Sequence, residues 1–482
     1  MFKYEIISCC FEVSYYMIDL LKIHGLYYNW MPISRNDMEN TIHIKISDYQ
    51  NKEIFGLIFS TRSIDSWHEI DIASEIQLDW YKLFFNKKDF LEFPTWNSCV
   101  YPINFEENNI DIKQLCYIKN NQNHHCIGIL SNSRKQVLLS IDIVKYLEYS
   151  LLGIESLNKS EDWCEINGFF KTHKKATNAF VDDLMVLIRT ILMKYCPNAM
   201  PVYIDYYPKG KTAPFIITGD SDESTFDDIT SYFEYLDKFN CKSCLLIRDT
   251  EILNKHKLFK LNYKRQNFGI HPFSQNRNIR EYLNNIQKLH KYLRNNFDSN
   301  YSYAVRNHLF QNINARKQLV IERGINIQFD MNSVLANNNS WIGTGSGVGI
   351  PIPYPPINNG YNINPLHLTT VIEDDVFLFD YQYCYKPFIN DQYSTNNLIL
   401  NFLNEWLLKK NKPAQANLHP QNSNEILCLI VDWITQNHIW NPNLNEYHQW
   451  LLERATTTIY VISDYKYKVE TNSSRINLFI IE

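Results

Sequence analysis

The sequence Ala213-Pro-Phe-Ile-Ile-Thr-Gly-Asp-Ser-Asp222 decides how the rest of the chain is interpreted. Its apolar run, Phe215 to Ile217, is typical of a strand that is buried on both faces, as in parallel sheets and α/β barrels. In barrels of this kind the chemistry lies at the carboxyl ends of the strands, and here two aspartates follow the strand. One carboxylate could hold a metal ion while the other accepts a proton from water. In the alternative interpretation, Asp220 and Asp222 only cap the helix that follows.

Composition limits the class of protein. A chain of 482 residues predicts two or three domains, and 45% hydrophobic with 21% charged residues indicates a folded protein. The net charge of −5 disfavours non-specific binding to nucleic acid. No apolar stretch reaches the ~18 residues of a membrane span. Eleven scattered cysteines indicate a reducing compartment, and Glu5, Glu12 and Asp19 interrupt the apolar N-terminus, so we expect a cytoplasmic protein.

Residues 1–200 are predicted to form an α/β accessory domain of unknown role. Strands are expected at 41–46, 54–59 and 136–142, and helices at 143–151 and 178–194. His124 and His125 are adjacent and would point apart in a strand, so we interpret them as surface residues. Two prolines in the segment 196–201 end the second helix, and we place the domain boundary there. The second domain is therefore predicted to span residues 201–482.

In the second domain, strand-like and helix-like segments alternate. This order predicts parallel βα units, arranged either as a barrel or as an open sheet. After the opening strand we expect strands at 244–247, 267–272, 301–305, 325–330, 366–372, 415–420 and 456–463, and helices at 226–236, 278–297, 312–323, 398–410, 423–437 and 444–454.

Polar residues stand at the ends of four of these strands. Asp220 and Asp222 follow the first strand, and His271, the pair Arg306 and His308, and His419 end three later strands. A single histidine at a strand end is more often a hydrogen-bonded structural residue than a ligand. Four strand ends that all carry Asp, His or Arg make a metal-dependent site the better interpretation.

Three other motifs are interpreted as structural. Thr225-Phe-Asp-Asp228 has no apolar strand before it, and we expect it to begin a helix. Cys241 and Cys244 form a lone CxxC without a second ligand pair, so we expect packing cysteines. The glycines of 343–349 fit neither a dinucleotide fingerprint nor a P-loop, and a loop close to a ligand is expected instead.

The strand-end motifs resemble those of the polysaccharide deacetylase superfamily, which includes the NodB-like domains of carbohydrate esterase family 4. The resemblance covers roughly residues 202–465 and rests on Thr218-Gly-Asp-Ser-Asp222, His271-Pro, Arg306-Asn-His308 and Asn417-Leu-His-Pro420. It implies a distorted (β/α) barrel that binds a divalent metal, commonly zinc. It also implies an enzyme that removes acetyl groups from amino sugars or acetylated glycans.

The resemblance assigns a role to each strand-end residue. It makes Asp220 the general base, Arg306 the partner of that base and His419 the general acid, and it makes Asp222 and His271 metal ligands. The family usually supplies a second histidine four residues after the first. Gln275 occupies that position here, and we expect His308 to provide the third ligand.

Four further residues are expected to contact the substrate. The backbone N–H of Leu309 would face the developing oxyanion. Gly345 and Ser346 belong to the glycine-rich loop, which also resembles that of divergent relatives. His367 is the second choice for the general acid.

The predicted function is deacetylation of a carbohydrate by a cytoplasmic enzyme, in surface polysaccharide biosynthesis by analogy with the family alone. Two alternatives stay open. The chain could be a carbohydrate-binding barrel without catalytic activity, for which the missing second histidine is the main support. It could also be a metal-dependent hydrolase of another C–N bond.

Overall fold

The structure is a computed structural model of the chain. It describes residues 3–8, 41–47, 56–60, 71–72, 82–85, 103–104, 112–120, 123–131, 136–140, 163–166, 170–173, 202–249, 265–274, 278–297, 300–308, 315–332, 365–374, 392–409, 411–422, 424–463, 466–476 and 478–480.

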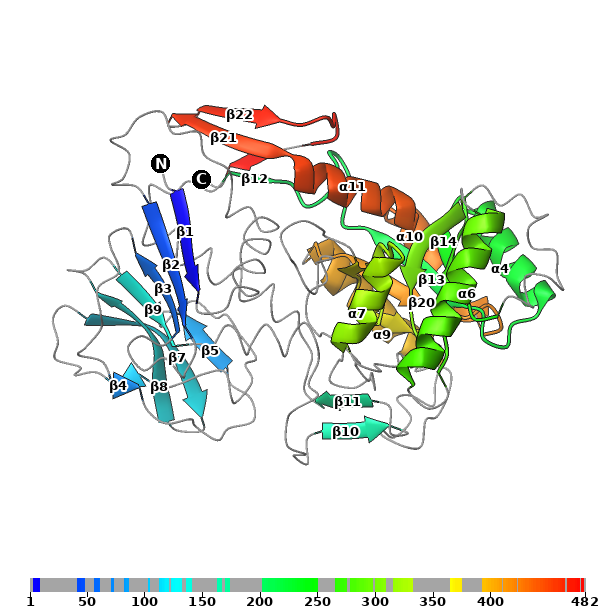
Figure 1. The fold of residues 1–482 in the computed structure, drawn as a ribbon, viewed down its shortest axis with the longest axis horizontal. Coiled ribbons are helices and arrows are strands. Elements are labelled where there is room, and N and C mark those ends of the chain that lie inside the picture. The colour runs from blue at the N-terminus through cyan, green and yellow to red at the C-terminus, as the bar shows by residue number, and fades with distance from the viewer. Residues whose placement is uncertain are drawn as a thin grey trace.

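The described part of residues 1–200 consists of strands. Seven of them form one mixed sheet in the order β1-β2-β3-β9-β8-β7-β5 (Figure 1). The predicted strands at 41–46, 54–59 and 136–142 are confirmed with small shifts, whereas the predicted helices at 143–151 and 178–194 lie outside the described residues. The strands of this region are β1 (Lys3–Ser8), β2 (Thr41–Ser47), β3 (Gly56–Ser60), β4 (Asp71–Ile72), β5 (Lys82–Phe85), β6 (Ile103–Asn104), β7 (Ile112–Asn120), β8 (Asn123–Ser131), β9 (Gln136–Leu139), β10 (Trp163–Ile166) and β11 (Phe170–His173).

The second half of the chain is built on an eight-stranded parallel sheet. Its order is β18-β17-β16-β15-β14-β13-β20-β19, and every neighbouring pair is parallel. The opening apolar run forms a central strand, as predicted, and all of its residues are buried. The strands are β13 (Phe215–Asp220), β14 (Ser243–Ile247), β15 (Asn267–Ile270), β16 (Tyr301–Val305), β17 (Phe329–Asp330), β18 (Leu366–His367), β19 (Ile372–Glu373) and β20 (Ala414–Asn417).

The two edges of this sheet are close together in space. Edge strands β18 and β19 do not pair with each other, yet only residues 368–371 separate them in the sequence. Because each extended residue spans at most about 3.5 Å, the two edges lie within about 20 Å along the chain. The sheet therefore curls into a barrel that is left open between β18 and β19, and the predicted distorted barrel is confirmed to this extent.

The prediction of a single strand over residues 366–372 was wrong. Residues 366–372 were expected to form one strand, but they form parts of two strands on opposite edges of the sheet. The apolar run is interrupted by Thr369 and Thr370, and Thr370 donates to Gln415 on β20 instead of continuing the ladder with β17. The predicted strand at 325–330 is likewise shorter, because only Phe329 and Asp330 pair with β16.

Helices follow the strands as the alternating pattern predicted. The predicted helix at 398–410 begins earlier than expected and ends in a π-helical segment. Thr225 and Asp228 form a reciprocal capping box at the start of α4, which confirms their structural interpretation. Cys241 and Cys244 are buried and unbridged, as expected of packing cysteines. The helices are α4 (Phe226–Lys238), α6 (Ile279–Phe297), α7 (Ala315–Gly324), α9 (Gln392–Leu403), η6 (Asn404–Lys409), α10 (Asn424–Gln436) and α11 (Leu444–Thr456).

The interior of the curled sheet changes from apolar to polar along the strands. Ile216, on the inner face of β13, belongs to an apolar core that also includes Leu246, Phe329, and Tyr447 and Trp450 of α11. Strand residues alternate between the two faces, so the next two inner positions on β13 are Thr218 and Asp220. The carboxyl end of the barrel is therefore lined by buried polar side chains, while α11 covers its apolar part (Figure 1).

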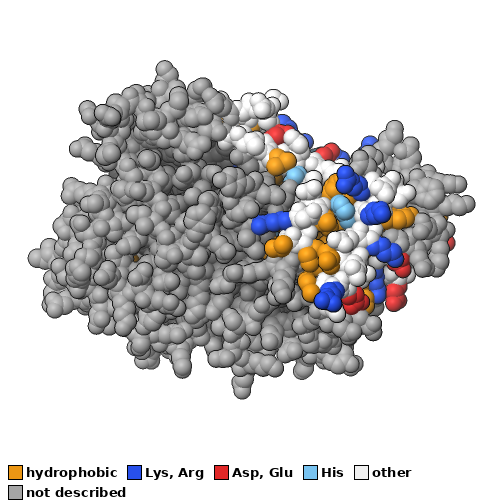
Figure 2. All heavy atoms as spheres, in the orientation of Figure 1, with side chains coloured by type: hydrophobic (Ala, Val, Ile, Leu, Met, Phe, Trp, Pro, Cys, Tyr) orange, Lys and Arg blue, Asp and Glu red, His pale blue; other side chains and the backbone are white. Residues whose placement is uncertain are grey.

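The remaining strands lie outside the barrel. β12 (Val202–Ile204) pairs with β23 (Leu478–Ile480), and β21 (Thr458–Ser463) forms a hairpin with β22 (Lys466–Glu470). Among the described residues, no helix combines the length and apolar character that a membrane span requires. On the described part of the face shown in Figure 2, lysine and arginine side chains are interspersed with apolar and acidic ones.

Candidate active site

The residues predicted from the strand ends lie together at the carboxyl end of the parallel strands. Asp220 ends β13, His271 follows β15, Arg306 follows β16, and His419 lies two residues after β20. These strands are parallel, so their carboxyl ends lie on the same side of the barrel. The structure therefore brings together side chains that are as far apart in the sequence as positions 220 and 419.

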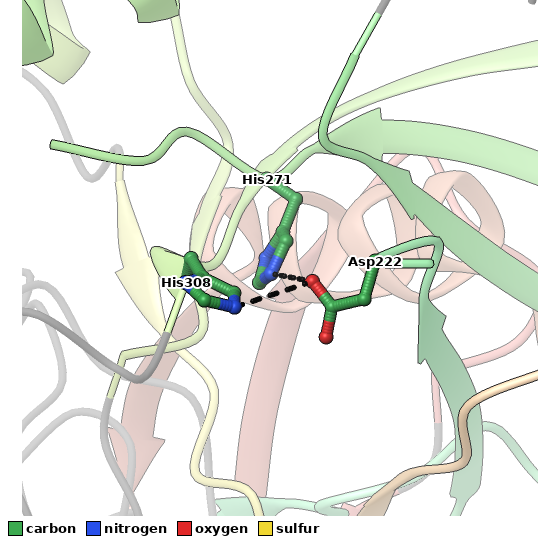
Figure 3. Close-up of side chains that lie close together, drawn as sticks. All are labelled: Asp222, His271 and His308. Carbon is green, nitrogen blue, oxygen red and sulfur yellow. Dashed lines mark hydrogen bonds and ion pairs between the residues drawn. The ribbon is translucent and has the colours of Figure 1, made fainter. Parts of the chain in front are cut away.

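Asp222, His271 and His308 form a group with the composition of a metal site. Each offers one ligand atom, and the three atoms lie within 4.8 Å of one another. The Asp222 Oδ1 atom is 3.1 Å from His271 Nε2 and 3.5 Å from His308 Nε2 (Figure 3). Two imidazole nitrogens and one carboxylate oxygen match the donor set of a catalytic zinc site, which uses three protein ligands and leaves a further position open.

Hydrogen bonding prepares His271 to act as a ligand. Its Nδ1 atom lies 2.7 Å from the backbone carbonyl oxygen of Arg306, and a carbonyl can only accept. Nδ1 therefore carries a proton, and Nε2 is the nitrogen that faces Asp222. A histidine ligand that donates its other N–H to a backbone carbonyl is a common arrangement around metals.

His308 is the residue that we expect to replace the second histidine of the motif, where this chain has Gln275. Its backbone N–H donates to the carbonyl of Pro272, and its ring lies edge-on to Phe273 and to His271. Burial, helped by the neighbouring His271, lowers the pKa of His308 to about 4. The ring is thus neutral near pH 7, which is the form that binds a metal.

Asp222 is held in its charged form. Burial alone would raise the pKa of this carboxyl, but His271 and His419 outweigh burial and keep it well below its usual range. The Asp222 carboxylate also lies between the pair His271 and His308 on one side and His419 on the other. One oxygen contacts the two proposed histidine ligands, and the other lies 3.3 Å from His419 Nε2.

Asp220 and Arg306 form a buried ion pair beside this group. Arg306 is fully buried, and its Nη2 and Nε atoms lie 2.7 and 3.1 Å from the two carboxylate oxygens. Arg306 also donates to Thr218 Oγ1 at 2.9 Å and to Asn417 Oδ1. Burial raises the pKa of Asp220, but the charge of Arg306, together with its hydrogen bond and with His271 and His419, outweighs burial and holds the pKa below its ordinary value.

His419 is oriented by an acidic residue that the sequence analysis did not single out as functional. Asp374 accepts from the backbone N–H of His419 at 2.7 Å, and its other oxygen lies 2.6 Å from His419 Nδ1. Burial lowers the pKa of His419, but Asp374 and Asp222 raise it well above its ordinary value. The available signal was the run of three acidic residues at 373–375, directly after a predicted strand.

Glu373, Asp374 and His419 form a second group with ligand atoms within 4.8 Å. All three residues are buried, and His419 Nδ1 is already engaged by Asp374. Glu373 accepts from Asn417, which in turn donates to Asp220. These contacts place the second group around His419, whereas Asp222, His271 and His308 form the group that could hold a metal.

The four predicted substrate-binding residues have different outcomes. Leu309, Gly345 and Ser346 lie outside the described residues, as does Gln275. His367 is buried at the end of β18, where its Nε2 atom is 3.1 Å from Asp330 Oδ2. The structure thus pairs His367 with an acidic residue on β17, whereas His419 lies beside the candidate metal ligands.

Solved structures of polysaccharide deacetylases match this chain over about half of its length. A proposed polysaccharide deacetylase of Mycobacterium smegmatis matches 53% of this chain and 96% of its own, with 11% identity and a TM-score of 0.38. A proposed polysaccharide deacetylase of Bordetella bronchiseptica, described as involved in O-antigen biosynthesis, matches 49% of this chain and 93% of its own, with 12% identity and a TM-score of 0.27. The peptidoglycan deacetylase PdaC of Bacillus subtilis matches 51% and 94%, with 9% identity and a TM-score of 0.29.

No protein-family model matches the sequence, and no curated protein matches it either.

Proposed function

We propose that this protein is a metal-dependent hydrolase that removes acetyl groups from a carbohydrate. One observation carries the proposal. The Asp220–Arg306 pair, the Asp222–His271–His308 group and the His419–Asp374 pair are linked by direct contacts at one end of the barrel. A base, a metal site and an acid within such a small volume are what acyl hydrolysis requires. The motif resemblance supports an acetylated sugar as the substrate.

Asp222, His271 and His308 would hold the cation, and their mixed nitrogen and oxygen donors favour zinc among the common divalent metals. When bound, such an ion polarises the acyl carbonyl and makes a neighbouring water more acidic. The protein keeps each donor in its binding form: the Asp222 carboxyl is ionised, the His308 ring is neutral, and His271 presents Nε2.

Asp220 is suited to accept the proton of the attacking water. Arg306 keeps its carboxylate ionised and fixes both oxygens, so the base has one orientation. As the water oxygen bonds to the acyl carbon, one proton of the water passes to Asp220. The burial of this pair strengthens its electrostatic interactions, since little water competes for them.

His419 is suited to protonate the leaving group. Asp374 accepts from Nδ1 and stabilises the imidazolium, which leaves the Nε2–H directed toward Asp222 and Asp220. When the bond between the acyl carbon and the sugar nitrogen breaks, the Nε2 proton passes to that nitrogen. Acetate and a free amine are the products, and an ester substrate would give acetate and a hydroxyl group.

The position of His308 weakens the alternative of an inactive sugar-binding barrel. The main support for that alternative was the absence of a second histidine after His271. The Nε2 atom of His308 lies 3.5 Å from Asp222 Oδ1, a position from which His308 could provide the third donor. Hydrolysis of another C–N bond would use the same residues, and substrate assays distinguish it from deacetylation.

The experiment combines metal analysis with acetate release. The zinc-loaded protein should release acetate from N-acetylated oligosaccharides, whereas Asp220→Asn should retain zinc and lose activity. His271→Ala should lose zinc, with His438→Asn, an exposed histidine with φ of 52°, as the matched control. Asp227→Asn on the exposed start of α4 is the control for the aspartate. A full equivalent of zinc in the double variant Asp222→Ala/His271→Ala would contradict the metal assignment.

A further inference from the structure

One side of the candidate site is open to solvent. Asp220, Arg306, His271 and His419 have side chains that are at most 5% exposed. Asp222 and His308 are more accessible, at 16% and 18%. A substrate must therefore approach over these two residues, and side chains beside them are positioned to select it.

Arg248 lies beside this open side. It directly follows β14, the strand between β13 and β15, and its side chain is 31% exposed. Its backbone N–H donates to Ser221 Oγ at 3.0 Å, which anchors it to the segment that carries Asp220 and Asp222. The guanidinium carbon lies 5.2 Å from the centroid of the Phe273 ring, and that ring also contacts His308.

The guanidinium of Arg248 keeps its donor groups available. Its closest acidic partner among the described residues is Asp222 Oδ1, at 3.7 Å, which is longer than a hydrogen bond. The guanidinium lies over the face of the Phe273 ring, a cation–π contact that uses no hydrogen-bond acceptor. Among the described residues, no acceptor lies within hydrogen-bond distance of the guanidinium, which carries five N–H donors.

The charge of Arg248 indicates what these donors bind. Among the described residues, its one acidic neighbour within 4 Å is Asp222, which is also a proposed ligand of a divalent cation, and a bound cation would engage that carboxylate. Two positive charges side by side, that of the cation and that of Arg248, would then favour an anionic group next to them. The planar fork of an arginine fits the paired oxygens of a carboxylate or phosphate.

We infer that Arg248 binds an anionic group of the substrate, a carboxylate or a phosphate, next to the acetyl group. The inference rests on the proposed function and narrows it to an acidic sugar. Arg248 would select the substrate rather than take part in bond breaking, because it lies on the open side of the site and the base and acid lie deeper.

Binding and turnover measured in parallel test this inference. We would titrate the zinc-loaded full-length protein with N-acetylglucosamine, with its C6-carboxylate analogue and with its 6-phosphate, using isothermal titration calorimetry. Hydrogen bonds between charged groups are stronger than those to neutral groups. We therefore expect at least one charged sugar to bind about tenfold to a hundredfold more tightly than the neutral sugar. The preferred charged sugar identifies the anion as carboxylate or phosphate.

Variants decide whether Arg248 causes the preference. Arg248→Ala should bring the ratio of charged to neutral affinity close to one, and Arg248→Lys should give an intermediate ratio because it keeps the charge but loses the fork. Arg265→Ala should keep the wild-type ratio, since Arg265 is exposed, precedes β15 at the opposite, amino end of the strands and bonds Asn240. Higher salt should reduce the preference of the wild type.

The outcomes separate this inference from the proposed function. An unchanged ratio in Arg248→Ala, or a wild type that binds all three sugars equally, would overturn the role of Arg248 even if acetate is released. Arg248-dependent binding of a charged sugar without acetate release would support the role of Arg248 and contradict the deacetylase assignment.

Discussion

Removing the buried positive charge of Arg306 should lower the stability of the barrel. In Arg306→Met the carboxylate of Asp220, in a residue that is only 3% exposed, would lose its guanidinium partner. Removing one partner of a buried ion pair typically costs about 3–5 kcal/mol, because the remaining charge is left without compensation. Asn417 still donates to Asp220 Oδ2 at 3.0 Å, and His271 Nδ1 lies 3.4 Å from Oδ1. We therefore expect a loss near the lower end, about 3 kcal/mol.

A double-mutant cycle separates the charge from the packing. Asp220→Asn/Arg306→Met removes both charges and retains side chains of similar volume. Replacing a buried pair with neutral groups is often close to neutral in stability. The double variant should therefore be more stable than Arg306→Met alone, by about 1–2 kcal/mol. A pure packing effect of methionine would instead leave both variants equally destabilised.

The measurement is urea denaturation of the metal-free protein, followed by circular dichroism. Metal-free conditions are needed because a bound cation would replace part of the charge lost with Arg306. Arg265→Met, at an exposed position, is the matched control and should change the unfolding free energy by less than about 0.5 kcal/mol. The electrostatic reasoning is refuted if Arg306→Met is within 1 kcal/mol of wild type, or if the double variant is the less stable one.

Three further predictions test other parts of the barrel. Asp374→Asn should lower acetate release by about a hundredfold at unchanged zinc content, because the imidazolium of His419 loses its anionic partner. Gly219→Ala should destabilise the protein by about 1–3 kcal/mol in urea melts, since a Cβ there would lie 2.3 Å from the Leu418 carbonyl oxygen. Burial lowers the pKa of His448 to about 4, so stability should fall as pH drops from 6.5 toward 4. His448→Gln should remove about 2 kcal/mol of the loss between pH 8 and pH 5 in urea melts, and an unchanged pH profile would contradict this.

The strands of the barrel were predictable wherever one apolar run forms one strand. β13, β14 and β16 consist of short apolar runs that end at a polar residue, and their positions agree with the structure. The segment 366–373 was not predictable in this way. Its two halves pair with opposite edges of the sheet, and only the three-dimensional curl of the other strands determines that separation.

The site was predictable to the extent that its residues follow strands. His308 was expected as the third ligand, and the structure places its ring against His271 and near Asp222. Asp374 was not predicted to have a role, because an acidic run after a strand also fits a solvated loop. Its contact with His419 depends on the pairing of β19 with β20, which joins residues more than forty positions apart.

Each residue of the opening motif 218–222 has a separate physical role. Thr218 and Asp220 share the inner face of β13, so the hydroxyl and the carboxylate both bond the same buried guanidinium. Gly219 leaves room for the carbonyl of Leu418, directly after β20, which any side chain would displace. Ser221 anchors the backbone after β14 through its hydroxyl. Asp222 lies beyond the end of the strand and is therefore not bound to alternate between its faces, which lets it reach both His271 and His419. The spacing of the two aspartates thus follows from one residue that must point into the barrel and one that must extend past its rim.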